Sequence, residues 1–321
     1  MMANILLRSP YFVTITTASH LSSKLELTID GTLRYTILKN ATSNRTLFEI
    51  ATLAKDYYTE SFGGSTGSTF DTVAISGSIT KYTGLNGTGS TIGSATTFTH
   101  TGFYGYSFFA NGKSANEIDP DDAELTNTGE TRIIYLPENT ASFAWDMNSG
   151  TKDKTTISTS ATSVTSASGQ YTWTIQRICN PKYGFVQMRF INRNGAPQDF
   201  YFFLKSVESV NTKNETFKRN IFDFATSEYD PKKHQNTVFN KSGKRRYTLN
   251  TEYLVEDYNA VIEDILLSEY VWIKYTSTEG SRTRPVIVNT SSLTKKTSVN
   301  DKLVQYTLEV EEANNIIDNV V

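Results

Sequence analysis

The chain has 321 residues, enough for two domains that each bury a hydrophobic core. Its 18 Tyr, 18 Phe and only 7 Pro, with 20% charged residues, favour strands and surface loops over long helices. The formal net charge of -2 argues against non-specific nucleic-acid binding by the chain as a whole. The single cysteine, Cys179, excludes a disulfide framework and a thiolate metal site, and we interpret it as a buried structural thiol.

The first 60 residues predict strands closed by a short helix. Residues 11–16, YFVTIT, are rich in β-branched and aromatic side chains. Residues 24–29 alternate between polar and apolar, and Asp30-Gly31 after them is a strong hairpin turn. A single apolar stripe then predicts a helix of about three turns, formed by Leu47, Ile50, Leu53, Ala54 and Tyr57.

The amino-acid composition of the chain changes between residues 63 and 168. Segments such as GGSTGST and GLNGTGSTIGSATT are rich in Gly, Ser and Thr, which is typical of flexible linkers. Runs such as ISGSIT, FYGYSFF and RIIYL are too apolar for a disordered tether, however, and predict short strands with long loops. We therefore predict an N-terminal β-rich domain at 1–168, with residues 63–168 as an extension or insert of its sheet.

The alternation of apolar and polar residues returns at residue 171 and predicts a second β-rich domain at 169–321. Asn194-Gly195, between the apolar runs 185–191 and 200–204, is the strongest short hairpin signal in the sequence. Residues 207–246 are polar and basic, and we interpret them as a long arm loop, because a connection of this length is usually functional or mobile. Residues 284–288 and 303–310 read as closing strands.

The clearest helix signal in the chain covers residues 252–269. Leu254, Tyr258, Val261, Ile262, Ile265 and Leu266 form one apolar stripe with a 3.6-residue period. Asn250 or Thr251 is the expected N-cap. A strand, residues 270–275, follows after about one turn, so we expect the helix to pack on the sheet of that strand. The predicted fold is thus mainly β, sandwich-like or barrel-like, with one packed amphipathic helix.

No motif for catalysis, a metal or a cofactor is found. The histidines, His20, His100 and His234, lie far apart, and we interpret them as structural or surface residues. The acidic turn DPDDAE at 119–124 lacks the spacing of a calcium loop. No glycine loop has the strand–loop–helix setting that cradles a phosphate. We expect a protein that is not an enzyme, binds no cofactor and, without an 18-residue apolar run, does not span a membrane.

The basic run at 241–246 is the most suggestive charge cluster. Its simplest interpretation is a solvated loop before a strand. The alternative is a contact with an acidic surface, either nucleic acid or a second copy of the chain. The predicted outer face of the helix offers such a surface, and head-to-tail contacts of this kind close into rings when the rotation allows. The candidate subunit-contact residues are Lys241, Lys244, Arg245, Arg246, Glu256, Asp257, Glu263 and Asp264.

Two parts of the chain carry a resemblance to a known class of proteins. LLRSPYFVTI, LELTIDGTLRYTILK and FEIATLAKDYY at the start, and VQMRFINRNGAPQDFYFFLKS and KRRYTLNTEYLVEDYNAVIEDILLSEYVWI later, resemble virion structural proteins of tailed bacteriophages of the crAss-like group, which infect Bacteroidetes. The resemblance covers about residues 1–60 and 171–312. It implies a tail or neck protein whose β-rich domains form a ring around the channel.

The resemblance implies an architectural function. Copies would form a homo-oligomeric ring that contacts other tail, neck or portal proteins, and DNA would pass through it without specific binding. The resemblance also implies a location in the virion. Since the first residues lack the features of a secretion signal, we expect synthesis in the host cytoplasm. The alternative is a glycan-binding β-sandwich in which surface aromatics stack on sugars, with Tyr104, Tyr106, Trp145 and Trp173 as candidates. A polysaccharide hydrolase is a third, weaker interpretation.

Overall fold

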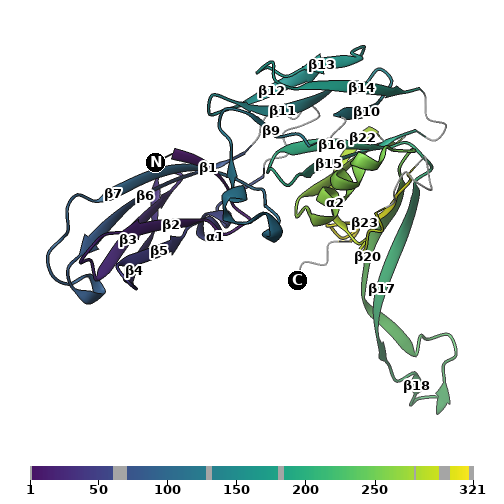
Figure 1. Ribbon diagram of the computed structural model, residues 1–321. Coiled ribbons are helices and arrows are strands. Elements are labelled where there is room, and N and C mark those ends of the chain that lie inside the picture. Colours follow the sequence, from purple (N-terminus) through teal and green to yellow (C-terminus); the bar gives the residue numbers. More distant parts are fainter. Residues whose placement is uncertain are drawn as a thin grey trace.

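A computed structural model describes residues 2–60, 71–127, 132–179, 184–277, 280–295 and 304–317. Strands make up 52% of the chain and helices 10%, which confirms the prediction of a mainly β protein with several sheets. Figure 1 shows three groups of strands, which we call the N-terminal module (2–118), the middle module (123–178) and the C-terminal module (186–317).

The N-terminal module is a sandwich of a large and a small sheet. The six-stranded sheet has the order β4 (Thr32–Asn40), β3 (Ser22–Ile29), β6 (Val73–Tyr82), β7 (Thr96–Phe103), β1 (Met2–Leu6) and β8 (Glu117–Ile118). Strands β2 (Phe12–Thr16) and β5 (Arg45–Glu49) cover it, and helix α1 (Ala51–Lys55) follows. Alternation in β3 buries Leu25, Leu27 and Ile29 between the layers. The Asp30-Gly31 turn joins β3 to β4, as predicted.

One expectation for this region needs correction. The three-turn helix from Leu47 is wrong, because Leu47 lies in β5 and the helix has only five residues. The apolar residues of a strand and of the short helix that follows it happen to have the spacing of one helical stripe. Residues 63–168 were predicted as an extension or insert of the first sheet, and their part 73–118 extends this sheet with β6, β7 and β8. Three 3-10 turns lie in the same stretch, at η1 (Leu85–Gly87), η2 (Phe109–Asn111) and η3 (Lys113–Asn116).

The middle module consists of two three-stranded sheets. One has the order β12 (Thr151–Ile157), β11 (Ser142–Asn148) and β9 (Ala123–Glu124); the other has β10 (Ile133–Pro137), β14 (Thr172–Ile178) and β13 (Ser163–Thr165). Trp173 is fully buried at its centre, with Leu136, Ala144 and Ile157. Strand β14, expected to open the second domain, therefore packs in this module. Cys179, directly after β14, is exposed, so the prediction of a buried thiol is wrong.

The C-terminal module is built on a seven-stranded antiparallel sheet. Its order is β16 (Pro197–Phe202), β15 (Val186–Ile191), β21 (Val271–Ser277), β22 (Gly280–Val288), β23 (Thr307–Glu312), β20 (Asn236–Asn250) and β17 (Val207–Lys218). The predicted turn at Asn194-Gly195 joins β15 to β16, and Gly195 has a φ of 80° there. Such a positive φ suits glycine because it carries no Cβ.

The amphipathic helix packs on this sheet, as predicted. Helix α2 (Asn259–Leu267) follows the 3-10 turn η4 (Glu256–Tyr258) and buries Val261, Ile262 and Ile265 against a core that includes Met188 and Phe190. It begins later than the predicted residue 252. Residues 251–254 instead bond to the last part of the chain, where Leu254 N donates to Val304 O over 2.9 Å. The Thr251 hydroxyl accepts from Tyr306 N at 2.9 Å, so it does not cap the helix.

Candidate assembly surfaces and the module junction

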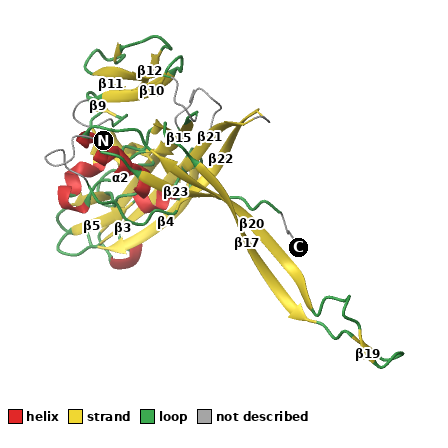
Figure 2. Ribbon diagram, turned by 90° about the vertical axis from the view of Figure 1, so that its right-hand side faces the viewer, coloured by secondary structure: helices red, strands yellow, loops and turns green. Residues whose placement is uncertain are grey.

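The predicted arm loop is a long β-hairpin. Strands β17 and β20 pair from Val207 with Thr248 to Lys218 with Asn236, and β18 (Phe222–Asp223) and β19 (Glu228–Tyr229) form a small sheet at the tip. Twelve residues at about 3.3 Å each give a shaft of roughly 40 Å. Figure 2 shows that it projects away from the rest of the chain. The arm is ordered because its backbone groups pair with each other, not because it has a core.

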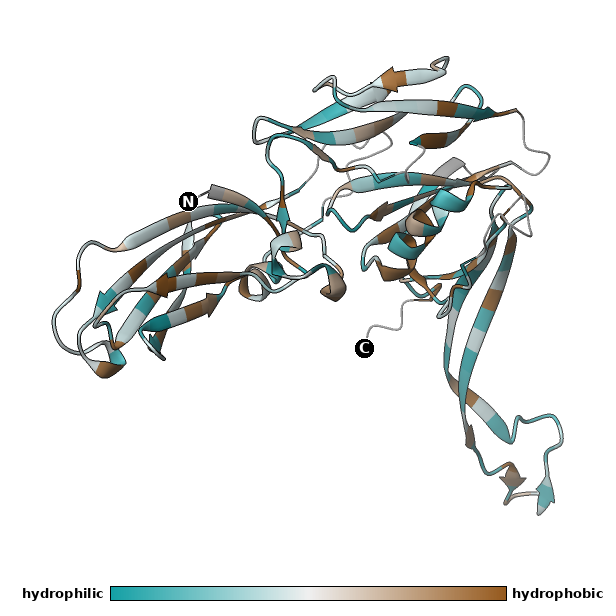
Figure 3. Ribbon diagram, viewed as in Figure 1, coloured by the Kyte–Doolittle hydropathy of each residue, from teal (hydrophilic) through white to brown (hydrophobic). Residues whose placement is uncertain are grey.

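The arm exposes apolar side chains along its whole length. All twelve residues of β17 are exposed. Figure 3 shows hydrophobic positions recurring on the shaft and at the tip. Phe224 is 81% exposed and Tyr229 70% exposed, values unusual for large aromatic side chains. The other exposed large apolar residues of the arm are Val207, Val210, Phe217, Val238 and Phe239. Exposed apolar side chains gathered in one projecting element are typical of an interaction surface.

The basic run lies on β20 at the base of this arm, not in a loop. Lys244 and Arg246 both bind Glu311 of β23, with N–O distances of 3.4 and 3.2 Å. Arg245 binds Glu208 of β17 at 2.9 Å, and Lys241 lies exposed farther out. Lys244 and Arg246 thus tie the arm to β23, and Arg245 links the two strands of the arm.

The four predicted acidic residues of the helix have different environments. Glu263 binds Lys295 at 2.7 Å, whereas Glu256 and Asp257 line a charged cleft described below. Asp264 was expected on the outer face, but it is only 2% exposed, so this expectation is wrong. It lies beside the apolar stripe, where the N-terminal module covers it.

The turn between β15 and β16 is the point where all three modules meet. Asn194 Nδ2 donates to the backbone oxygens of Glu124 and Leu125 in the middle module, over 3.1 and 3.2 Å. On its other side, Arg193 O accepts a hydrogen bond of 2.7 Å from Tyr106 N of the N-terminal module. A Cβ on Gly195 would lie 2.7 Å from Tyr104 N, so glycine permits this close approach.

Helix α2 is tied to the same junction through Asp264. The Tyr106 hydroxyl donates to its Oδ1 at 3.0 Å, and Arg193 N donates to its Oδ2 at 3.5 Å. Burial raises the pKa of Asp264 to about 6, although the nearby Arg193 and the Tyr106 hydrogen bond lower it. The sequence could not reveal this contact, because Tyr106 is more than 150 residues away.

A second polar cluster crosses the junction at Glu269. Arg8 and Lys55 of the N-terminal module bind its carboxylate at 3.2 and 3.1 Å, and the Tyr104 hydroxyl donates to it. Burial raises the pKa of Glu269, but the hydrogen bonds from Tyr104 and Lys55 and the charge of Arg8 outweigh it, so the pKa lies below its usual value. Next to it, Tyr104 stacks on Tyr58 with centroids 4.3 Å apart. The junction is therefore closely packed.

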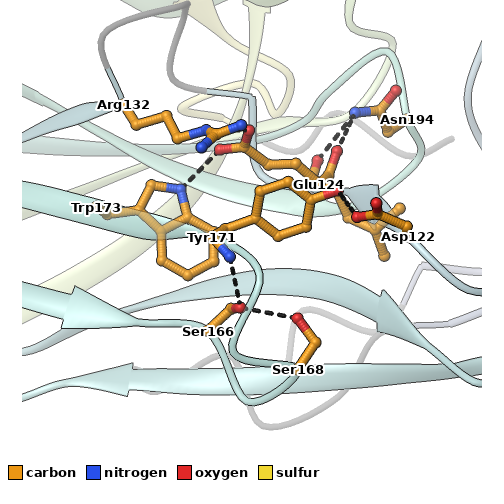
Figure 4. Close-up of polar contacts among 9 residues, drawn as sticks. Asp122, Glu124, Arg132, Ser166, Ser168, Tyr171, Trp173 and Asn194 are labelled. Carbon is orange, nitrogen blue, oxygen red and sulfur yellow. Dashed lines mark hydrogen bonds and ion pairs between the residues drawn. The ribbon is translucent and has the colours of Figure 1, made fainter.

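The middle module holds a charged network beside the turn (Figure 4). Figure 4 shows Trp173 and Arg132 both directed at the carboxylate of Glu124, with N–O distances of 2.7 and 3.1 Å. Burial raises the pKa of Glu124. Glu124 and Arg132 also line a cleft of about 520 Å³ that reaches helix α2, together with Asn127, Arg193, Glu256, Asp257, Asn259, Ala260 and Lys295. Within this lining, Glu124 and Arg132 form an ion pair at 3.1 Å.

The aromatic residues proposed to stack on sugars do not form an exposed platform. Trp173 is fully buried, and Tyr104 and Trp145 are each 4% exposed. Tyr106 is half-buried at the junction. The expectation that these are surface aromatics is wrong, because they fill the core of the middle module and the contacts between modules.

The remaining candidates for chemistry are dispersed. His20 and His100 are buried and His234 is exposed. Within the described ranges, no group of three or more His, Cys, Asp or Glu residues is arranged to hold a metal ion. None of the described helices has both the length and the apolar character required to cross a membrane.

Comparison with known proteins identifies no relative. No protein-family model matches the chain, and neither the curated proteins nor the solved structures include a match.

Proposed function

We propose that this chain is a structural subunit of a bacteriophage virion that assembles into a ring in the tail or neck. The observation that carries the proposal is the arm formed by β17 and β20. All twelve residues of β17 are exposed, and large apolar side chains are exposed along the shaft and at the tip of the arm. Ordering each residue costs about 1–2 kcal/mol, and burial against a partner is the usual compensation. The resemblance of residues 1–60 and 171–312 to virion proteins supports the same class.

The junction supports this function in a second way. A subunit of a ring has to hold its contact surfaces at a fixed angle, because a heterologous contact closes only at one rotation. The three modules are joined by side-chain and backbone hydrogen bonds around Asn194 and by the buried Asp264. Genome passage and contacts with portal or tail proteins follow from the proposed ring and remain part of the proposal.

The test is to measure particle mass and image negatively stained protein over a range of concentrations. A matched variant has a shortened arm, in which residues 213–242 are replaced by a two-residue Asn-Gly turn. This keeps the pairing of β17 and β20 up to Thr212 and Gly243, at the base of the arm. The full chain should form closed rings of one copy number, and the variant should be monomeric with an unchanged unfolding midpoint. Monomers of the full chain at every concentration, or rings of the shortened variant, would contradict the proposal.

A further inference from the structure

The small sheet of the N-terminal sandwich leaves part of the large sheet uncovered. Strand β2 pairs with β5 along one edge, and no described residue pairs with its other edge. Beside this free edge, over β7, lies a cavity of about 530 Å³, which we call the edge groove. Phe12 and Ile15 of β2 form one wall and Phe98 of β7 forms part of the floor. A sheet edge beside an apolar groove is the geometry that accepts an added strand.

Two polar atoms in the edge groove are buried without a partner. His100, which is 2% exposed, has no hydrogen bond to Nδ1 among the described residues, and Thr14 Oγ1 has none either. The rings of Tyr11 and Phe98 both pack against the ring of His100, with centroids 5.3 and 5.2 Å away. Because neighbouring atoms enclose these two polar atoms, the surface that the edge groove offers to a partner is mainly apolar.

The tip of the arm has complementary features. Phe222 packs against Phe224 and Tyr229, with centroid distances of 5.1 and 5.3 Å, and presents them outward. Strands β18 and β19 are a two-stranded sheet with unpaired outer edges among the described residues. Figure 1 shows the arm and the N-terminal module on opposite sides of the molecule, so the tip does not reach the edge groove of its own copy.

The charges at the two surfaces also match. Lys113 lies exposed at the rim of the edge groove and has no ion pair with a described residue. Glu228 lies exposed at the tip, next to Tyr229, and likewise has no ion pair within the described ranges. We propose that the arm tip of one copy docks in the edge groove of the next copy, with Phe224 and Tyr229 against Phe12 and Phe98. This inference rests on the proposed ring and specifies which surfaces of neighbouring copies touch.

The docking is head-to-tail, since two different surfaces of each copy take part. A chain of such contacts continues from copy to copy until it closes into a ring. Backbone bonds to the free edge of β2 would supply affinity, and the aromatic side chains would fix the register. The pairing of Lys113 with Glu228 lies at the rim, where it contributes on the order of a fivefold change in the association constant.

The test uses cross-linking between copies. Cys179 is first replaced by Ser, and then Phe224→Cys at the tip is combined with Ser114→Cys at the edge groove. A disulfide requires two Cα atoms within roughly 7 Å, so it reports a direct contact. The matched control combines Phe224→Cys with Thr36→Cys on the exposed edge strand β4. We expect a ladder of covalent oligomers from the first pair and none from the control or from either single cysteine.

A charge exchange gives a second, independent readout. Lys113→Glu and Glu228→Lys should each weaken assembly about fivefold, and the double variant should recover it. Closed rings that contain no cross-link between positions 224 and 114, or a double variant without recovery, would overturn this inference while the ring itself stands. A chain that forms no rings at all would overturn the proposed function as well, so the two failures are distinguishable.

Discussion

The turn at Asn194-Gly195 offers a sharp test of how the modules are held together. Gly195 has a φ of 80°, and a Cβ there would lie 2.7 Å from Tyr104 N and 2.9 Å from Gly105 N. Gly150, in the turn between β11 and β12, has a φ of 79° and no atom within 4 Å of its ideal Cβ. Gly195→Ala and Gly150→Ala therefore share the backbone cost of about 1 kcal/mol, and only the first adds a collision.

The collision is with backbone atoms at the end of β7, which cannot rotate away. Forcing extra volume into a packed site typically costs about 1–3 kcal/mol. We expect Gly195→Ala to lose about 2–4 kcal/mol of unfolding free energy and Gly150→Ala about 1 kcal/mol. Gly105→Ala is a further check, because its Cβ would lie 2.2 Å from Arg193 O. Urea denaturation followed by tryptophan fluorescence measures all three. Equal losses for Gly195→Ala and Gly150→Ala would refute this account of the junction.

Three further predictions concern buried groups. Because the pKa of Asp264 is raised from 3.8 to about 6 in the folded protein, stability should fall as the pH rises between these values, and Asp264→Asn should remove most of that decline in denaturation curves recorded from pH 4 to 7. Asp199→Ala removes the carboxylate that binds the buried Arg189 at 2.6 Å and should cost about 3–5 kcal/mol, whereas Glu208→Ala at the exposed arm should cost less than about 1 kcal/mol; similar thermal shifts would contradict this. Ile262→Ala should cost about 2–5 kcal/mol by urea denaturation, and a loss below about 1 kcal/mol would show that the helix does not pack as described.

Local signals predicted the parts of the fold that local interactions determine. Asp30-Gly31 and Asn194-Gly195 form the hairpin turns expected of them, because these dipeptides adopt a positive φ at little cost. The apolar stripe of α2 lies on the sheet, since its burial is the main source of its stability. Alternation in β3 identified a strand with one buried face. In each case the residues that decide the structure are close together in the sequence.

The parts that were missed depend on distant residues or on exposed surfaces. Strand β17 has no buried face, so it shows no alternation, and its polar sequence reads as a loop. This strand forms because its backbone pairs with β20, about 30 residues later. Asp264 looked like an outer-face residue because Tyr106, which covers it, belongs to another module. The sequence also gives no sign of the edge groove, because the groove forms where β2, the edge strand of the small sheet, lies over β7 of the large sheet.

The proposed contact explains why the junction and the arm have such different construction. The edge groove belongs to the N-terminal module and the arm to the C-terminal module, so the angle between neighbouring copies depends on how these modules are joined. A flexible joint would allow many angles, and rings of many sizes or open chains would result. The joint instead contains Gly195 against the backbone of Tyr104, the buried Asp264, and Glu269 with its two cations. A rigid junction combined with a projecting arm is the construction that a ring of one copy number requires.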